Sequence, residues 1–142
     1  MAYFRATDPF PLESADQTQL AEFYVRLGAG RLTTTACGGC GRVAWPPRAF
    51  CAECGADQFR WTELPREGVV HAFTVQETGV PAGFESPRVF AIVTVGGHRI
   101  FTVITGGDPA RVTIGQRVRL APLRIPDDSK GQPRWLPGFT PL

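Results

Sequence analysis

The sequence has little of what an enzyme needs to act alone. Among its 142 residues are four cysteines, two histidines and one methionine, and Lys130 is the single lysine. The G-x-S-x-G, H-E-x-x-H and H-x-E…P-C-x-x-C motifs of hydrolases, metalloproteases and zinc deaminases are absent. His71 lies in a strand-like segment and His98 in a turn, and Asp127 and Asp128 fall in a polar stretch. These side chains are expected to be structural or solvated, so no active site complete within this chain is predicted.

Long hydrophobic runs and an excess of charge of one sign are also absent. No apolar run approaches the ~18 residues of a membrane span. The first ten residues, MAYFRATDPF, lack the apolar core and cleavage pattern of a signal peptide. We therefore expect a cytoplasmic protein whose cysteines stay reduced. The 15 basic and 13 acidic residues leave a net charge of +2, which is too small to indicate binding to nucleic acid or an anionic membrane by charge alone.

All four cysteines lie in one stretch, CGGCGRVAWPPRAFCAECG, at positions 37 to 55. It contains two C-x-x-C pairs separated by ten residues, each followed by glycine, and each pair can place two thiolates on one side of a tight turn. Two such turns facing each other form a tetrahedral site of four sulfurs, which suits Zn²⁺ and leaves no open position for catalysis. Two disulfides, a redox dithiol and rubredoxin-like iron are the alternatives. We predict one structural zinc ion held by Cys37, Cys40, Cys51 and Cys54.

A short amphipathic helix is predicted before the cysteines, in SADQTQLAEFYVRLGAG. Ser14 or Asp16 can cap its start, and Gly28 can end it. Its apolar positions recur at the i, i+3, i+4 and i+7 spacing of one helix face: Leu20, Phe23, Tyr24 and Leu27. This stripe can pack on the rest of its own chain or on a partner subunit. In the second case these four residues form the docking surface.

From Gly68 onward the sequence alternates in the manner of short β-strands. Strands are predicted at 68–77, 89–95, 99–105 and 117–125, with a weaker fifth in PRWLPGF near the end. Two glycines after the second strand predict a tight hairpin, and Asp108-Pro109 predicts one helical turn between the third and fourth strands. Five strands with this spacing fit an OB-type barrel. We expect a mainly β fold in three parts: an N-terminal segment with the helix (1–30), a rubredoxin-like zinc ribbon with four cysteine ligands (31–64) and a five-stranded OB-fold barrel (65–142).

Several motifs, taken in this order, resemble a known family. They are FYVRLGAG, the paired cysteine turns with WPPR between them, GVVHAFTV, the loop PAGFESP and the closing PGFTP. Over roughly residues 18–142 the chain resembles the zinc-ribbon/OB-fold proteins associated with acyl-CoA and thiolase-like enzymes. The resemblance implies a non-catalytic auxiliary subunit that docks a thiolase-fold partner and shapes the entrance for a CoA thioester. The reaction implied is thiolysis, Claisen condensation or retro-aldol cleavage, with the catalytic residues on the partner.

The resemblance also implies that this chain touches the CoA at the interface with its partner. The CoA phosphates suit arginine and lysine, and the pantetheine arm suits an apolar groove. The long loop at 78–88 and the C-terminal tail are the expected places, because loops at a barrel rim often carry function. The candidates are Arg48, Phe84, Arg88, Arg124, Lys130, Arg134 and Trp135. For each arginine, a solvated surface position is the alternative.

Two other functions are compatible with the pattern. OB-folds bind single-stranded nucleic acid through aromatic and basic side chains on one face, but Phe73 and Phe101 lie in apolar strands and are expected in the core. A stand-alone acyl-CoA-binding regulator without a catalytic partner is the second alternative. The expected assembly is a hetero-oligomer of this chain with a thiolase-fold protein, with neither a membrane nor nucleic acid as a partner.

Overall fold

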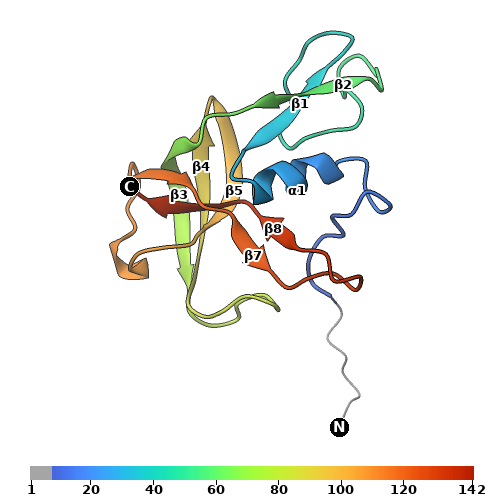
Figure 1. The fold of residues 1–142 in the computed structure, drawn as a ribbon. Helices are drawn as coiled ribbons and strands as arrows, with labels where there is room; N and C mark the ends of the chain where they lie inside the picture. The colour runs from blue at the N-terminus through green and yellow to red at the C-terminus, as the bar shows by residue number, and fades with distance from the viewer. Residues whose placement is uncertain (1–7) are drawn as a thin grey trace.

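The computed structural model describes residues 8–142, and its helix lies between a small sheet and a barrel (Figure 1). In chain order the elements are α1 (Ala21–Gly28), β1 (Thr33–Cys37), β2 (Phe59–Glu63), β3 (Glu67–Gln76), β4 (Arg88–Val95), β5 (His98–Ile104), the short 3₁₀ helix η1 (Pro109–Arg111), β6 (Arg117–Leu120), β7 (Leu123–Ile125), β8 (Arg134–Leu136) and β9 (Gly138–Pro141). Strands β1 and β2 form the ribbon that holds the cysteines. The predicted combination of a helix, a four-cysteine ribbon and a five-stranded barrel is confirmed.

Five strands close the barrel in the order β3, β4, β5, β9 and β6. All neighbouring strands are antiparallel except β5 and β9, which run parallel through the pairs Val103–Gly138 and Ile104–Phe139. The first three barrel strands are consecutive in the chain, and the last strand inserts between the third and the fourth. This connection gives the Greek-key barrel expected of an OB-fold.

The predicted fourth strand, at 117–125, is interrupted. It divides into β6 and β7 at Pro122, which has no N–H to donate to a neighbouring strand. The predicted fifth strand divides likewise at Pro137, so that β8 pairs with β7 outside the barrel and β9 closes the barrel. Glycine is needed where these segments cross, because a Cβ added at Gly138 would lie 2.5 Å from the Ala121 carbonyl oxygen.

The two turns predicted from glycine and proline are confirmed. Gly96 and Gly97 join β4 to β5 with φ values of 54° and 84°, the left-handed pair that a two-residue hairpin of type I′ requires. Before η1, Asp108 Oδ1 accepts the Ala110 N–H at 2.9 Å, and Pro109 is the first helical residue. Short-range residue chemistry is sufficient to specify both turns.

Helix α1 begins later than predicted. Its first residue is Ala21, and neither Ser14 nor Asp16 caps it. The Ser14 carbonyl oxygen instead accepts two N–H bonds in a separate turn that precedes the helix. The helix ends at Gly28, as predicted. The acidic and hydroxyl side chains that suggested a cap therefore belong to the turn.

The apolar face of α1 packs against its own chain. Phe23 and Leu27 are buried in the core shared by the ribbon and the barrel, and the Phe23 ring stands edge-on to Trp45 at 5.9 Å. The helix also approaches β8 so closely that a Cβ added at Gly28 would lie 2.4 Å from Trp135 Nε1. The prediction that Phe23 and Leu27 dock a partner is therefore wrong, because intramolecular packing already covers both side chains.

Within residues 8–142, no helix is both long and apolar enough to cross a membrane. The prediction that the chain has no signal peptide rests mainly on residues 1–7, which lie outside the described residues. The expected cytoplasmic location stays a prediction.

Candidate metal centre and ligand surfaces

The four cysteines converge at one end of the ribbon. Cys37 is the last residue of β1, and the other three lie between β1 and β2. All four Sγ atoms lie within 4.8 Å of one another, and no pair is bonded as a disulfide. The Cys37–Cys54 and Cys40–Cys51 sulfurs are 3.5 and 3.7 Å apart. Sulfurs about 2.3 Å from a tetrahedral zinc ion are about 3.8 Å apart, so the donor set fits zinc.

Two glycine-ended turns shape this centre. Gly41 (φ 77°) and Gly55 (φ 75°) adopt the left-handed region, and their N–H groups close the turns at 3.0 and 2.9 Å. The Cys40 and Gly39 N–H groups donate to Cys37 Sγ at 3.4 and 3.2 Å. These bonds lower the pKa of the Cys37 thiol and favour the thiolate that a metal needs.

The centre is closed, and its role is structural. Four protein sulfurs fill a tetrahedral coordination sphere and leave no position for water or substrate. A bound zinc ion would hold the long loop between β1 and β2 against the end of β1. The predicted cofactor, a structural zinc ion, thus agrees with the donor set and its geometry.

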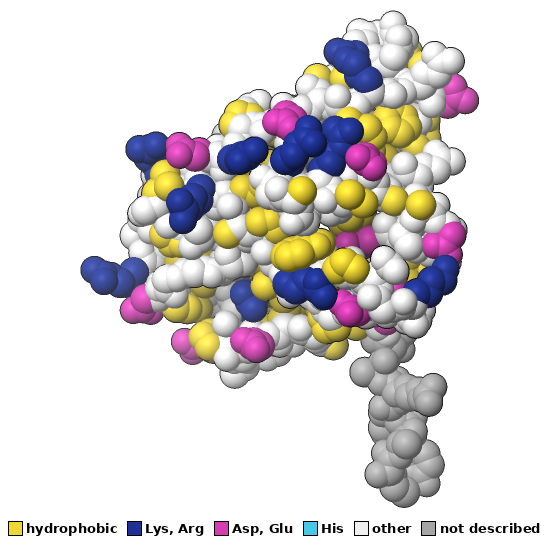
Figure 2. Space-filling model, in the orientation of Figure 1, with side chains coloured by type: hydrophobic (Ala, Val, Ile, Leu, Met, Phe, Trp, Pro, Cys, Tyr) yellow, Lys and Arg dark blue, Asp and Glu magenta, His cyan; other side chains and the backbone are white. Residues whose placement is uncertain are grey.

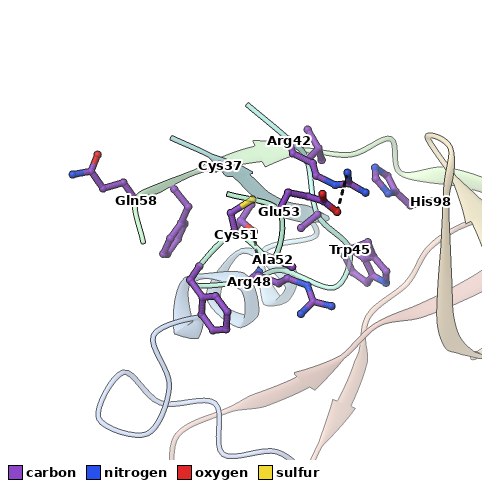
Figure 3. A pocket seen from close by; sticks show the side chains of 14 residues that line it. Cys37, Arg42, Trp45, Arg48, Cys51, Ala52, Glu53, Gln58 and His98 are labelled. Carbon is purple, nitrogen blue, oxygen red and sulfur yellow. Dashed lines mark hydrogen bonds and ion pairs between the residues drawn. The ribbon is translucent and has the colours of Figure 1, made fainter. Parts of the chain in front are cut away.

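A cavity of about 440 Å³ lies beside the metal centre (Figure 3). Trp45 and Arg48 line it from the ribbon, and His98 lines it from the barrel. Arg42, also in this wall, pairs with Glu53 at 3.3 Å. Arg48 is exposed and forms no ion pair within residues 8–142. This cavity therefore offers the Arg48 charge, but not that of Arg42, to an anionic ligand.

The loop between β3 and β4 brings Phe84 and Arg88 together. Arg88 Cζ lies 5.9 Å from the centroid of the Phe84 ring, within the range of a cation–π contact. Arg88 Nε is buried and has no hydrogen-bond partner among the described residues. A buried donor without a partner is the kind of group that a bound anion or carbonyl oxygen satisfies. Arg88 therefore remains a candidate for ligand binding.

Three further candidates meet at the β7–β8 hairpin. Arg124 pairs with Asp127, and its Cζ lies 5.4 Å from the centroid of the Trp135 ring. Lys130 Nζ pairs with Asp16 Oδ2 at 2.5 Å. Lys130 and Trp135 line a cavity of about 680 Å³ between the hairpin and α1. Both cations already have carboxylate partners, so their charge is balanced within the chain.

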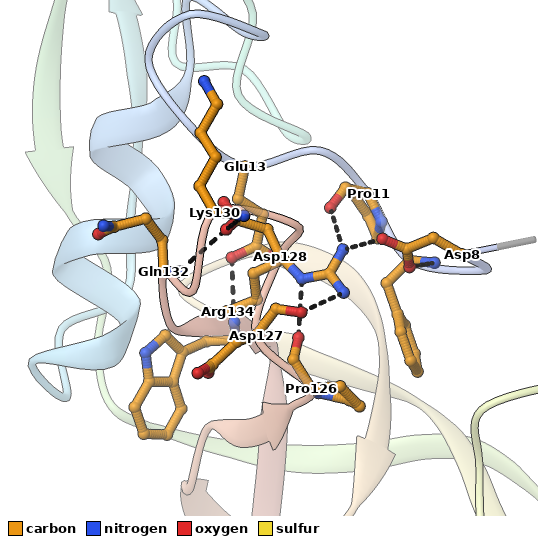
Figure 4. A network of polar contacts seen from close by, with 11 residues as sticks. Asp8, Pro11, Glu13, Pro126, Asp127, Asp128, Lys130, Gln132 and Arg134 are labelled. Carbon is orange, nitrogen blue, oxygen red and sulfur yellow. Dashed lines mark hydrogen bonds and ion pairs between the residues drawn. The ribbon is translucent and has the colours of Figure 1, made fainter.

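Arg134 has a structural role (Figure 4). Its side chain is 3% exposed and donates to Asp8 Oδ2 at 2.7 Å. Other guanidinium N–H groups donate to the carbonyl oxygens of Pro11, Pro126 and Asp127. The predicted contact of Arg134 with CoA phosphates does not hold, because the guanidinium is enclosed and its donors tie the N-terminal segment to the β7–β8 turn.

Sequence reasoning missed Glu13, which is 6% exposed. Its Oε1 accepts the Trp135 N–H at 3.0 Å, and its Oε2 is buried without a partner among the described residues. Burial raises the pKa of Glu13 to about 7; the Trp135 hydrogen bond and the Arg134 charge oppose this effect, and Asp128 adds to it. Nothing local marks Glu13, because its hydrogen-bond partner lies 122 residues further along the chain.

We expect Glu13→Gln to remove part of the pH dependence of stability. A carboxyl with a raised pKa binds its proton more tightly in the folded state, so its stabilisation is full below its unfolded pKa of 4.5 and is lost as the pH rises through about 7. The wild type should lose about 1–3 kcal/mol of unfolding free energy by this route. Urea unfolding at acidic and alkaline pH measures the difference. Glu85→Gln, on an exposed loop, is the control, and an unchanged pH dependence in Glu13→Gln would contradict the assignment.

The remaining ligand candidates do not form one site. Arg48 lies at the ribbon, Phe84 lies on the loop before β4, Arg88 is the first residue of β4, and the others lie at the β7–β8 hairpin. On the face shown in Figure 2, basic, acidic and apolar side chains are interspersed, with no single basic patch. Of these places, only the ribbon and the start of β4 carry arginines without carboxylate partners among the described residues.

Two family models match adjacent parts of the chain. Residues 26–60 match the rubredoxin-like zinc ribbon domain of ChsH2, and residues 61–121 match the C-terminal OB-fold domain of ChsH2. Comparison with proteins of curated function gives no match.

Solved structures agree with the family models. A chain of the "Ltp2-ChsH2(DUF35) aldolase" is similar over 85% of this chain and 92% of that chain, with 29% identity and a TM-score of 0.70. A DUF35-family protein of unknown function from Sulfolobus solfataricus is similar over 85% of this chain and 83% of its own, with 16% identity and a TM-score of 0.57. The second likeness shows the fold alone. The chain thus belongs to the ChsH2 family, in which a rubredoxin-like zinc ribbon is followed by a C-terminal OB-fold domain.

Proposed function

We propose that this chain is the non-catalytic subunit of a hetero-oligomeric complex that makes or breaks a C–C bond next to the thioester carbonyl of an acyl-CoA. The observation that carries the proposal is the similarity, at 29% identity, to a chain of the Ltp2-ChsH2(DUF35) aldolase. That relative favours retro-aldol cleavage over thiolysis and Claisen condensation. The proposed partner is a thiolase-fold protein that supplies the nucleophile and the acid–base residues.

The side chains of this subunit support a role without catalysis of its own. Its thiols fit a closed metal centre, which leaves no sulfur for nucleophilic attack. His71 is exposed on β3, and His98 lies in the wall of the cavity beside the ribbon. Neither arrangement provides the nucleophile and oriented base that acyl chemistry requires.

The docking surface in this proposal is the exposed side of α1 together with the ribbon. Away from its buried face, α1 presents Val25, and the ribbon presents Phe50. Leu20 and Tyr24 are only partly buried and extend this surface. Large exposed apolar side chains on a protein surface commonly mark an interface. The zinc ion would keep the ribbon part of the surface rigid.

The CoA thioester, in the same proposal, lies along the loop between β3 and β4. Phe84 offers an apolar wall to the pantetheine arm, and Arg88 offers a guanidinium without a carboxylate partner to a phosphate. Arg48 offers a second unpaired guanidinium at the ribbon cavity. Arg124 and Lys130 are weaker candidates, because a phosphate would compete with carboxylates that already bind them.

Purification of the tagged chain from its native host tests the proposed function. A thiolase-fold protein should co-purify at near-equal stoichiometry, with about one zinc ion per chain as a closed centre of four cysteines requires. The complex should consume an acyl-CoA, and the isolated chain should not. A chain that binds acyl-CoA but recovers no thiolase-fold protein would contradict the proposal and favour a stand-alone regulator.

In that complex, Arg88→Ala should raise KM for the acyl-CoA more than it lowers kcat. A phosphate contact is the same in the ground state and the transition state, so its loss weakens binding without slowing the chemical step. A charged hydrogen bond worth about 1.5–3 kcal/mol corresponds to a rise of roughly 10- to 150-fold. Arg119→Ala, which removes an exposed arginine on β6, is the matched control. An unchanged KM would remove Arg88 from the site.

A further inference from the structure

The outer face of β4 and β5 carries two stacked aromatic rings. The Phe90 and Phe101 centroids are 5.9 Å apart, and their planes differ by 9°. Phe101, expected in the core because its strand is apolar, is 68% exposed. The reason is strand alternation: Ile100 and Thr102 point into the barrel, so the residue between them points out. Ile92, paired with Phe101 across the two strands, extends the same outer face.

Two further aromatic rings extend this stack, and both lie on the side of Phe90. Phe84, from the loop before β4, stands edge-on to Phe90 at 5.4 Å, and Phe10 stands edge-on to Phe84 at 5.5 Å. Phe10 is buried, whereas Phe101 ends the row in solvent. The row of rings therefore ends at Phe101. Its neighbours support the position of this ring, and its exposed surface is open to a ligand.

An arginine lies near each ring of the Phe90–Phe101 stack. Arg99 is exposed on β5, two residues before Phe101 and on the same outer face. That spacing corresponds to about 7 Å along a strand. Arg88 stands in the same relation to Phe90 on β4. Neither arginine forms an ion pair within residues 8–142, in contrast with the paired cations of the β7–β8 hairpin.

The position of these residues in the barrel indicates that they bind a ligand. Strands β4 and β5 are the second and third strands of the barrel, and Phe84 lies on the connection between the first and second. In OB-folds, the face of strands two and three and this connection are the ordinary ligand surface. Aromatic rings there stack on nucleotide bases, and neighbouring cations bind the phosphates.

We propose that the outer face of β4 and β5 binds a nucleotide, with the base stacked on Phe101 and a phosphate at Arg99. The base and the phosphate can belong to a single-stranded nucleic acid or to the adenine end of CoA. Only the second source rests on the proposed function. Binding to this face involves the chain alone and requires no catalytic partner.

Titration of the zinc-loaded chain with two probes tests this inference. The probes are adenosine 3′,5′-bisphosphate and a single-stranded oligonucleotide, and amide chemical shifts map the contact. The shifts should fall on β4 and β5. Phe101→Leu should weaken binding by about 5- to 150-fold, the factor that corresponds to about 1–3 kcal/mol for one stacked base. Phe101→Trp should retain affinity. Ile114→Ser, at a side chain that is 70% exposed on another surface, is the matched control.

The two sources give different results. If nucleic acid is the natural ligand, affinity should rise with the number of nucleotides. Arg99→Gln should then reduce the slope of log affinity against log salt concentration by about 0.7. If the natural ligand is the adenine end of CoA, the oligonucleotide should bind no more tightly than the mononucleotide, and CoA should compete with both probes.

Two outcomes would overturn the inference. One is the absence of shifts on β4 and β5 with either probe. The other is Phe101→Leu binding as tightly as the wild type. If neither nucleotide binds and Phe101→Leu abolishes co-purification of a partner protein, the face is a protein contact and the inference fails while the proposed function stands. If nucleotides bind but no thiolase-fold partner is recovered, the proposed function fails and the inference stands.

Discussion

Cys40→Ala will abolish metal binding and unfold the ribbon. Three remaining thiolates cannot close a tetrahedral site, and a structural zinc ion contributes about 10–16 kcal/mol to the folding of comparable small modules. Without it, the five residue pairs of β1 and β2 are the main ladder left in the ribbon, and a two-stranded sheet is marginally stable on its own. The zinc content should fall from about one ion per chain to near zero.

Hydrogen exchange and co-purification measure this result. Amides of β1 and β2 should exchange faster in Cys40→Ala, whereas those of β4 and β5 should stay protected inside the barrel. The partner should no longer co-purify, because the docking surface includes the ribbon. Ala52→Ser changes the second cysteine turn without removing a ligand, and it should assemble normally. Normal assembly and activity of Cys40→Ala without bound metal would refute the docking role of the ribbon.

Arg134→Met should destabilise the protein by about 2–4 kcal/mol. Its guanidinium serves the carboxylate of Asp8 and three carbonyl oxygens, and each buried acceptor left without a donor costs about 1–3 kcal/mol. Methionine retains much of the apolar volume, so the loss reports the polar contacts and not a cavity. The N-terminal segment should detach from the β7–β8 turn. Urea unfolding monitored by tryptophan fluorescence measures the change.

Lys130→Met is the matched control for Arg134→Met. Lys130 also pairs with an acidic residue of the N-terminal segment, but both partners are about half exposed or more. Surface pairs contribute about 0–1 kcal/mol, so this variant should unfold close to the wild type. If both variants lose the same stability, the buried network has no special role. If Arg134→Met instead raises KM for acyl-CoA at unchanged stability, the excluded CoA contact must be restored.

The metal centre was the most predictable part of the site. Its ligands lie within 18 residues of one another, and their spacing, with the glycines that follow, already specifies two turns that aim sulfurs at one point. The same holds for the β4–β5 hairpin and η1, where glycine, aspartate and proline select the backbone conformation. Local chemistry decides these features, so tertiary contacts could only confirm them.

The helix shows where a local pattern stops being informative. Phe23, Tyr24 and Leu27 of the predicted apolar stripe lie in the helix, and Leu20 lies just before it. An apolar stripe indicates only that another surface covers it. The structure shows that the cover is the chain's own core for Phe23 and Leu27. The start of the helix was misplaced because hydroxyl and carboxylate side chains favour both caps and free-standing turns.

By itself, the sequence determined the class of fold through its strand pattern and motifs, and it determined the metal ligands and the turns because these depend on residues close together in the chain. Tertiary structure alone decided which polar groups are buried and which rings are exposed. Arg134 was predicted to bind CoA and Glu13 was not singled out, yet both are buried by contacts that include residues more than 100 positions away in the chain. The sequence pattern predicted Phe101 in the core. In a barrel strand, however, the face of the sheet on which a side chain lies is set by register with β4. Burial is a property of three-dimensional neighbours, and a linear pattern cannot report neighbours that only the closed barrel brings together.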